Sequence, residues 1–360
     1  MRDIIKKLVD GRDLTESEME QSMGRILDGD APPAQIGAFL VALRMKGETV
    51  DEIVGAAKAA RNRTKKIHLN NHLINIDRDE INVEEETILD TFGTGEEGTA
   101  TFNVSTATAF VAAGAGVRVV KQGTRTVSAQ CGGADVLRRL GIKLDINHSS
   151  LEACIQENGI GFLYTPLFSG GMKHISEARR EIGLRTIFNL IGPLSNPADA
   201  KAQVLGVYSP DQTEKMARVL DRLGAREAFV VHGEGTFDEI SICGPTHMSH
   251  LKDNAVTNSV LMPEDFGLER VAPERIKGGN ARENARIIEN VLDGEKGPKR
   301  DLVALNTAAA FVVTGLDADF RQGIERAEDA IDSGRARQKL DAVVAFTQDC
   351  RAFVRGEFQP

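Results

Sequence analysis

The feature that most constrains the fold of this chain is the alternation of short β-type runs with helical stretches from about residue 87 onward. The runs are TILDTF (87–92), VRVVKQ (117–122), GFLYTP (161–166), QVLGVYS (203–209) and AFVVHG (228–233). Strands separated by helices are typical of a sheet whose neighbouring strands run parallel and whose faces are covered by helices. We therefore expect an α/β domain with a largely parallel central sheet.

The first part of the chain, residues 1 to about 65, has a helical pattern instead. Thr15 with Glu18, and Thr49 with Glu52, fit the capping box that satisfies free amides at a helix start. Residues 34–45 between them are mostly apolar, whereas a helix at the surface would also have a polar face. We expect a small all-helical N-terminal domain whose middle helix is buried against a partner helix or a second subunit.

Other regions are less informative. Residues 62–86 are polar and charge-segregated, which indicates a linker or a hairpin between domains. The stretch GGNARENARIIENVLDG (278–294), with Asn280 and Glu283 as its cap, and the apolar stretch ALNTAAAFVVTG (304–315) predict helices of the scaffold. We find no internal repeat.

The composition excludes several classes of protein. The chain has 360 residues, 41% of them apolar, and is long enough for two domains. Its formal charge of −9 disfavours broad attraction to nucleic acid or to anionic lipid. No apolar run approaches the roughly 20 residues of a membrane span, and the first residues do not resemble a signal peptide. We expect a protein of the reducing cytoplasm, because the cysteines are too widely spaced for a zinc site or a disulfide framework: Cys131, Cys154, Cys243 and Cys350.

Residues 90–106, DTFGTGEEGTATFNVST, join the first strand to a helix. Gly93, Gly95 and Gly98 match G-x-G-x-x-G, but a dinucleotide fold also needs an acidic residue about 20 positions further on. Here the next strand carries Lys121 near its end, and no G-K-[S/T] follows the glycines as in a P-loop. What remains is a helix start with free amides and hydroxyls, which favours a polyphosphate. The residues at this helix start are Thr101, Asn103, Ser105 and Thr106.

Charged residues around this loop indicate a metal ion and a second anion-binding segment. Glu96 and Glu97 would repel a phosphate unless they point away, bond to sugar hydroxyls or act through a cation such as Mg²⁺. Asp238 and Glu239 follow a strand and a glycine turn, where both could face that cation, although such a pair is most often a surface feature. The stretch KQGTRTVSAQ (121–130) is either an ordinary basic turn or a cradle for an anion.

Together these motifs resemble the anthranilate phosphoribosyltransferase family. The matching stretches run in order from about residue 10 to at least 315: GRDLTESE, GTGEEGTATFNVSTATAFVAA, KQGTRTVSAQCGGADVL, MKHISEARREIGLRTIFNLIGPLSNP and VVHGEGTFDEIS. The resemblance implies a helical domain joined to a larger α/β domain, and a homodimer formed through the helical part. It also implies Mg²⁺-dependent transfer of the 5-phosphoribosyl group from phosphoribosyl pyrophosphate (PRPP) to the amine of anthranilate, a step of tryptophan biosynthesis.

The resemblance also implies a division of the chain and a set of contacts. Residues 1–65, joined by a helical segment near 172–190, would form the helical domain, and residues 66–171 and 191–360 the PRPP-binding domain. No acid–base residue is implied, and Lys121 and Arg125 would stabilise the leaving group electrostatically. PRPP would be bound by Gly93, Gly95, Glu97, Thr101, Asn103, Ser105, Thr106, Lys121, Gly123, Arg125 and Ser128. Mg²⁺ would be held by Ser105, Asp238 and Glu239, and the acceptor by Gly93, Thr124 and Arg179.

Three departures from the family pattern leave alternatives open. The family typically has K-H-G-N-R where this chain has KQGTR (121–125), and H-P-A-M-K where this chain has SGGMK (169–173). The G-G-D-G of the family's glycine loop is replaced here by Glu96, Glu97 and Gly98 after Gly95. Because Gln122, Thr124 and Ser169 fall where the family binds the aromatic ring, the alternative is a relative that acts on another aromatic acid or amine. The net negative charge disfavours a non-catalytic relative that binds nucleic acid. A nucleoside phosphorylase of related architecture is disfavoured because the DEIS tetrapeptide follows the pattern of the transferases.

Overall fold

A computed structural model describes residues 1–69, 72–77, 80–85, 87–94, 101–123, 132–164, 171, 174–236 and 238–350, with backbone only for 72–77 and 80–85. Its helices are α1 (Arg2–Val9), α2 (Glu16–Leu27), α3 (Pro33–Lys46), α4 (Val50–Arg61), α5 (Val104–Gly114), α6 (Gly133–Arg139), α7 (His148–Asn158), α9 (Ser176–Ile182), α10 (Ile187–Ile191), α11 (Gln212–Arg222), α12 (Ala281–Leu292), α13 (Pro298–Thr314), α14 (Phe320–Asp332) and α15 (Arg335–Asp349). Its strands are β1 (His72–Asp77), β2 (Glu80–Glu85), β3 (Ile88–Gly93), β4 (Arg118–Gly123), β5 (Ile160–Tyr164), β6 (Ala202–Gly206), β7 (Glu227–Gly233), β8 (Thr246–Lys252) and β9 (Ala255–Leu261). Short 3₁₀ helices cover Pro263–Phe266 and Pro273–Ile276.

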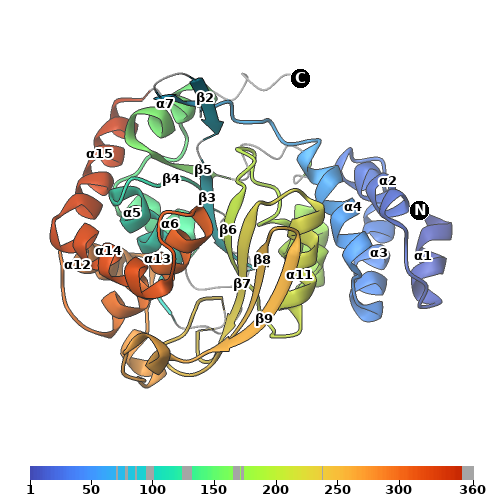
Figure 1. Cartoon of the computed structure of the whole chain (residues 1–360). Helices are drawn as coiled ribbons and strands as arrows, with labels where there is room; N and C mark the ends of the chain where they lie inside the picture. Colours follow the sequence, from blue (N-terminus) through green and yellow to red (C-terminus); the bar gives the residue numbers. More distant parts are fainter. Residues whose placement is uncertain are drawn as a thin grey trace.

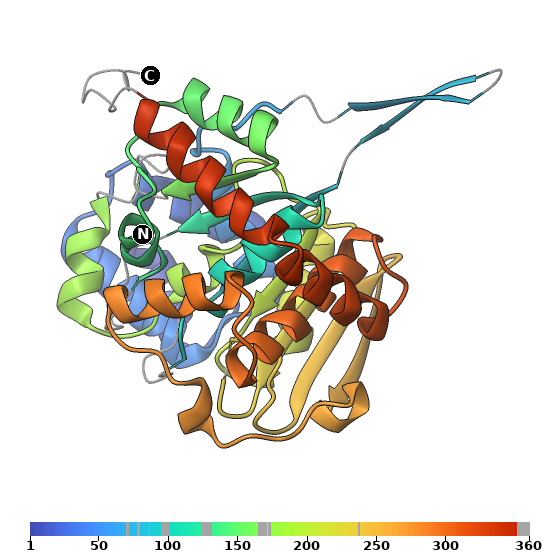
Figure 2. The same cartoon turned by 90° about the vertical axis from the view of Figure 1, so that its left-hand side faces the viewer.

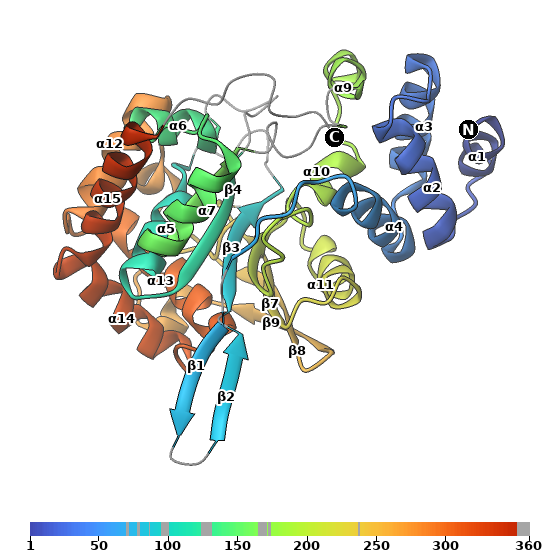
Figure 3. The same cartoon turned by 90° about the horizontal axis from the view of Figure 1, so that it is seen from above.

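Helices α1 to α4 form a helical part beside the sheet (Figure 1). Both predicted capping boxes are present, one at the start of α2 and one at the start of α4. The apolar stretch 34–45 lies in α3, which buries Ile36, Phe39 and Leu43 in a core shared with α9 and α10. Figure 3 shows α9 and α10 lying beside α3 and α4, far from them in the sequence.

The α/β part is built on a seven-stranded sheet with the order β5-β4-β3-β6-β7-β8-β9. The strands from β5 to β7 pair in parallel, as the alternation of strands and helices predicts. Strands β8 and β9 are antiparallel additions, joined by a tight turn at Asp253 and Asn254, whose φ angles are 51° and 59°. We did not predict these two strands; β9 is largely exposed and so lacks an apolar pattern.

Helices cover both faces of the sheet. Helices α5 and α13 pack on one face, with α12, α14 and α15 outside them (Figure 1). Helix α11 packs against β7 and β8 on the other face and also contacts α4, so the helical part is attached on that side. Within the described ranges, no helix combines the length and the apolar run needed to cross a lipid bilayer.

The polar segment 62–86 contains a hairpin rather than a plain linker. Strands β1 and β2 pair antiparallel, from His72 opposite Glu85 to Asp77 opposite Glu80. Figure 2 shows this hairpin extending away from the body of the molecule. The hairpin alternative of the sequence analysis is therefore the one observed.

A buried arginine joins α13 to α14. Arg300 is 1% exposed, and its guanidinium donates hydrogen bonds to Asp332 Oδ1 at 2.6 Å and to Asp332 Oδ2 at 2.9 Å. The hydrogen bonds from Arg300 and Lys296 lower the pKa of Asp332 from 3.8 to about 2. A carboxyl group whose pKa is lower in the folded state contributes stability above its unfolded pKa, and that contribution is lost as the pH falls to the folded value.

We predict that Asp332→Asn lowers the free energy of unfolding at pH 7 by about 1 kcal/mol, a modest loss because water screens the half-exposed carboxylate. The difference from wild type should stay constant at neutral pH and shrink as the pH falls from about 4 to about 2. Urea unfolding at a series of pH values measures both quantities. A difference that is the same at pH 7 and at pH 2.5 would contradict this account.

Candidate functional site

Three glycines end three neighbouring strands at the carboxyl edge of the sheet. They are Gly93 of β3, Gly206 of β6 and Gly233 of β7. A Cβ on Gly206 would lie 1.9 Å from the backbone oxygen of Asp238, and one on Gly93 would lie 2.6 Å from Asp238 Oδ2. A Cβ on Gly233 would lie 2.3 Å from the backbone oxygen of Glu239. Glycine is therefore required where residues 238–239 cross the strand ends.

Asp238 and Glu239 are held over these strand ends as a pair of acidic side chains. Glu239 Oε2 is sealed from solvent and accepts no hydrogen bond from the part of the chain that the structure describes. Burial and the nearby charge of Asp238 raise the pKa of Glu239 well above its usual value, and Lys121 opposes this only in part. In the described ranges, no third His, Cys, Asp or Glu completes a metal cluster with them. Two carboxylates in this position are stabilised by a cation.

Lys121 lies in β4 and is 5% exposed. Its Nζ donates hydrogen bonds to the backbone oxygen of Thr91 and, at 3.1 Å, to Ser105 Oγ. Burial lowers the pKa of Lys121 to about 8, although Asp90 and Glu239 favour its charged form. The ammonium group thus connects β4 with β3 and with the first turn of α5.

Two residues that we did not predict, Asp90 and Asn196, influence the charge of Lys121. Asp90, 1% exposed, accepts a hydrogen bond at 2.7 Å from Asn196 Nδ2, which also donates to the backbone oxygen of Val120 at 2.7 Å. Burial raises the pKa of Asp90, whereas Lys121 and Asn196 lower it. The available signals were an aspartate inside the apolar run TILDTF and the asparagine of GPLSNP.

The first turn of α5 lies next to Lys121. Asn103 is the N-cap residue, but its side chain makes no capping hydrogen bond to the helix. Ser105 is partly exposed beside Lys121, whereas Thr106 is 1% exposed. Thr101 precedes the helix and pairs with Lys277 in an isolated antiparallel bridge. The amides of Val104 and Thr106 already donate to the backbone oxygens of Phe102 and Asn103. The positive end of the helix dipole beside the Lys121 cation is therefore what suits this helix start to binding an anion.

Arg179 lies on α9, in the part that packs with α3. Its Nη2 donates to Asn189 Oδ1 at 3.4 Å, its guanidinium carbon lies 5.5 Å from the centre of the Phe188 ring, and burial lowers its pKa. No hydrogen bond or ion pair between described residues joins Arg179 to the surroundings of Lys121. We did not predict Arg185, whose guanidinium carbon lies 4.0 Å from the centre of the Tyr208 ring. The charge of Arg185 also interacts with that of Asp238.

The structure thus brings Gly93, Ser105, Lys121, Asp238 and Glu239 together, with Asn103 at the adjoining helix start. Gly123 ends β4 and is buried, and a Cβ there would lie in ordinary van der Waals contact with Leu137, at 3.7 Å. The other predicted residues lie outside the described ranges: Gly95, Glu96, Glu97, Gly98, Thr124, Arg125, Ser128 and Ser169.

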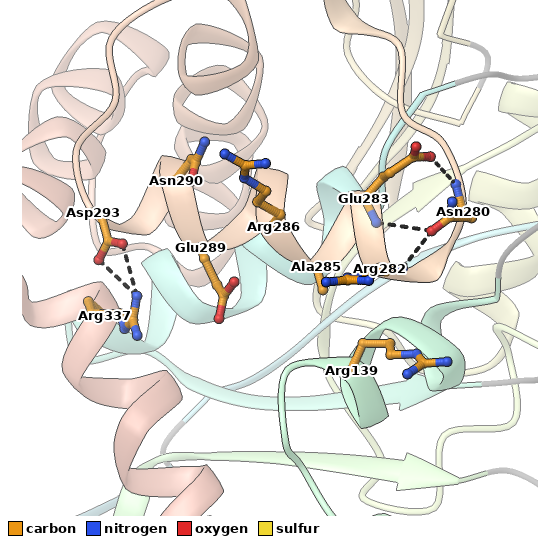
Figure 4. A pocket seen from close by; sticks show the side chains of 10 residues that line it. All are labelled: Arg139, Asn280, Arg282, Glu283, Ala285, Arg286, Glu289, Asn290, Asp293 and Arg337. Atoms are coloured by element: carbon orange, nitrogen blue, oxygen red, sulfur yellow. Dashed lines mark hydrogen bonds and ion pairs between the residues drawn. The ribbon is translucent and has the colours of Figure 1, made fainter.

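A separate groove of about 950 Å³ lies along α12, where it faces α6 and α15 (Figure 4). Its wall mixes four arginines with three acidic residues, and Asp293 and Arg337 form an ion pair at 2.9 Å. None of the residues predicted for the site lines this groove. We therefore place the functional site at the strand ends.

We predict that Gly206→Ala lowers the free energy of unfolding by about 1–3 kcal/mol, because its Cβ would displace the backbone of Asp238. The matched control is Gly37→Ala in α3, where a Cβ meets nothing within 4 Å. That control should raise stability by up to about 1 kcal/mol, the usual gain from replacing glycine in a helix. Denaturant unfolding measures both, and equal effects of the two substitutions would contradict the close approach.

Comparison with protein families agrees with this architecture. Residues 85–337 match the α/β domain of a glycosyl transferase family, and residues 2–64 match the helical bundle domain of a glycosyl transferase family. The predicted fold class, a helical N-terminal domain plus a larger α/β domain with a largely parallel sheet, is confirmed.

Individual relatives are similar over almost the whole chain. Anthranilate phosphoribosyltransferase of Geotalea uraniireducens is 49% identical over 345 residues, which cover 96% of this chain and 99% of that protein. The enzyme of the same name from Symbiobacterium thermophilum is 49% identical over 352 residues, 98% of this chain and 99% of that protein.

Solved structures agree with these relatives. The crystal structure of anthranilate phosphoribosyltransferase from Thermus thermophilus has a TM-score of 0.86 and 37% identity, and covers 96% of this chain and 99% of that one. The structure of the Saccharomyces cerevisiae enzyme in complex with PRPP and Mg has a TM-score of 0.84 and 29% identity, and the match covers 96% of this chain and 97% of that one. This chain belongs to the anthranilate phosphoribosyltransferase family.

Proposed function

We propose that this chain transfers the 5-phosphoribosyl group of PRPP to the amine of anthranilate and releases pyrophosphate, with Mg²⁺ as its cofactor. The observation that carries the proposal is the meeting of Lys121, Ser105 and the Asp238–Glu239 pair at one edge of the sheet. The names of the relatives, which share nearly half of its residues over almost its full length, support the same reaction.

The chemistry of the reaction fits this arrangement. Breaking the bond between C1 of the ribose and pyrophosphate leaves negative charge on the leaving group. Lys121 is suited to stabilise that charge, because its buried ammonium is already oriented by Thr91 and Ser105. The positive end of the α5 dipole adds to this stabilisation without any rearrangement. An aromatic amine is already a nucleophile, so positioning can replace a strong general base.

Ser105, Asp238 and Glu239 fit a magnesium ion by their chemistry. They offer a hydroxyl and two carboxylates, the hard oxygen ligands that Mg²⁺ prefers, and Glu239 Oε2 is buried with no described donor. When bound, Mg²⁺ would neutralise charge on the leaving pyrophosphate. Solved structures of the yeast relative with Mg bound support this assignment.

The remaining site assignments are part of the same proposal. Lys121 and Arg125 act electrostatically, with no acid–base residue. PRPP is contacted by Gly93, Gly95, Glu97, Thr101, Asn103, Ser105, Thr106, Lys121, Gly123, Arg125 and Ser128. The acceptor is contacted by Gly93, Thr124 and Arg179.

Anthranilate is the acceptor that the comparisons favour. A yeast relative has been solved in complex with 4-fluoroanthranilate, at 28% identity and a TM-score of 0.83. The alternative, another aromatic acid or amine, gains no support from the relatives described above. Gln122, one of the departures behind it, is 3% exposed and so belongs to the interior of the described structure.

Assembly and location complete the proposal. Val9 and Met45 are 70% and 83% exposed, on α1 and α3 of the helical part, and apolar side chains this exposed favour contact with a second subunit. We infer a homodimer through α1–α4, with the domain boundaries 1–65 (with the segment near 172–190), 66–171 and 191–360. We place the enzyme in the cytoplasm and in tryptophan biosynthesis.

The purified protein with PRPP and Mg²⁺ should consume anthranilate, followed by its fluorescence, and should leave other aromatic acids unchanged. Lys121→Met should lower kcat/KM at least about a hundredfold, because a preorganised charge at the leaving group is lost. The control Lys339→Met removes an ammonium that bonds Asn158 far from the site, and should keep full activity. Turnover of another aromatic acid in preference to anthranilate would favour the alternative acceptor.

Glu239→Gln keeps the shape of the side chain and removes a buried charge that has no described donor. Without metal at pH 8, the variant should unfold at the same temperature as wild type or above it, since an ionised carboxylate is costly there. Mg²⁺ with PRPP should raise the Tm of wild type by several degrees and that of the variant much less. Differential scanning fluorimetry measures this, with exposed Glu325→Gln as control. Equal shifts in wild type and Glu239→Gln would remove Glu239 from the metal site.

A further inference from the structure

The segment before α12 lies against the segment before α5. Lys277 pairs with Thr101, and a Cβ on Gly278 would lie 2.7 Å from the backbone nitrogen of Phe102. No side chain fits between two backbones this close, so glycine at position 278 is what permits the contact. The start of α12 is therefore in direct contact with the backbone that leads into the PRPP-binding helix start.

Asn284, in the first turns of α12, connects these two segments through its amide. It is 3% exposed; its Oδ1 accepts a hydrogen bond from Gly279 N at 2.7 Å, and its Nδ2 donates to Asn103 Oδ1 at 3.1 Å. The backbone N–H of Gly279 can only donate, so the oxygen of Asn284 must face it and the nitrogen must face Asn103. Because Asn284 Nδ2 can only donate, the Asn103 atom that faces it must be the acceptor Oδ1.

This chain of hydrogen bonds determines which atom Asn103 can offer to a ligand. With Oδ1 engaged by Asn284, the remaining polar atom of the side chain is the donor Nδ2. No described residue accepts a hydrogen bond from that Nδ2, and Asn103 is partly exposed at the start of α5. A fixed N–H donor at a helix start is complementary to a phosphate oxygen, whereas a side chain without this hydrogen bond could turn away from the phosphate or present its oxygen to it.

We propose that Asn284 is a positioning residue for PRPP, which holds the amide of Asn103 so that its Nδ2 faces the diphosphate. The inference rests on the proposed function, because it assigns the orientation of one residue of that PRPP site. Asn284 acts through Asn103 and does not touch the substrate.

The helix that carries Asn284 starts from a rigid turn. Asn280 Oδ1 accepts from the backbone amides of Arg282 and Glu283, and Glu283 Oε2 accepts from Asn280 N at 2.8 Å (Figure 4). Asn280 and Glu283 line the outer groove, whereas Asn284 is turned inward to Asn103. The cap fixes the direction in which α12 starts, and it therefore also fixes the position from which Asn284 contacts Asn103.

The test is steady-state kinetics of Asn284→Ala, Asn103→Ala and the double variant in the full-length protein. Asn284→Ala should raise KM for PRPP about tenfold, the usual effect of losing one charge-assisted hydrogen bond. KM for anthranilate and kcat should change less than about threefold by the same reasoning. The double variant should have the same KM for PRPP as Asn103→Ala alone, because Asn284 acts only through Asn103. The matched control is Asn290→Ala on the same helix, which should leave all constants unchanged.

A second variant keeps the proposal testable if Asn284→Ala folds poorly. Asn103→Asp can still accept from Asn284 but presents an oxygen to the diphosphate, so it should bind PRPP more weakly than Asn103→Ala. The proposal is overturned if Asn103→Asp binds PRPP as well as wild type, or if the effects of Asn284→Ala and Asn103→Ala on KM for PRPP multiply. Failure of the proposed function is a separate result, because wild type would then show no PRPP-dependent turnover at all.

Discussion

The site depends on the interaction of the buried ammonium group of Lys121 with nearby carboxylates. Its charge interacts with that of Asp90, whose carboxylate accepts a hydrogen bond from Asn196, and with that of Glu239. Because burial penalises its charge, Lys121 keeps a pKa of about 8 only with these opposite charges nearby. Asp90 therefore has a role in the protein without ligands as well, because its charge favours the ammonium form of Lys121 at the place where we propose that a diphosphate binds.

Much of this arrangement could be predicted from the sequence. The alternation of runs such as VRVVKQ and AFVVHG predicts the parallel strands, and a parallel sheet gathers the residues after its strands at one edge. That rule places Lys121 and Asp238 at the same edge of the sheet. The capping boxes at Thr15 and Thr49 likewise predict two helix starts that the structure confirms.

What the sequence could not provide was tertiary pairing. Asp90 reads as one polar residue in an apolar strand, and only the fold shows that Asn196 and Lys121 share its charge. Strand β9 escaped prediction because an exposed edge strand needs few apolar residues. Gly206 and Gly233 are unremarkable in a chain with 35 glycines until the backbone of 238–239 is seen to cross them.

The attachment of the helical part has a mechanical consequence. Lys121 is fixed in the sheet, whereas Arg179 is carried by α9 together with α3, and α11 stands between β7 and α4. In the proposed reaction the acceptor at Arg179 must reach the donor at Lys121, and the distance between these two residues depends on how α4 packs on α11. A change in the packing of α4 on α11 would then alter the rate at which the two substrates meet, whereas the affinity of the protein for each substrate alone would stay the same.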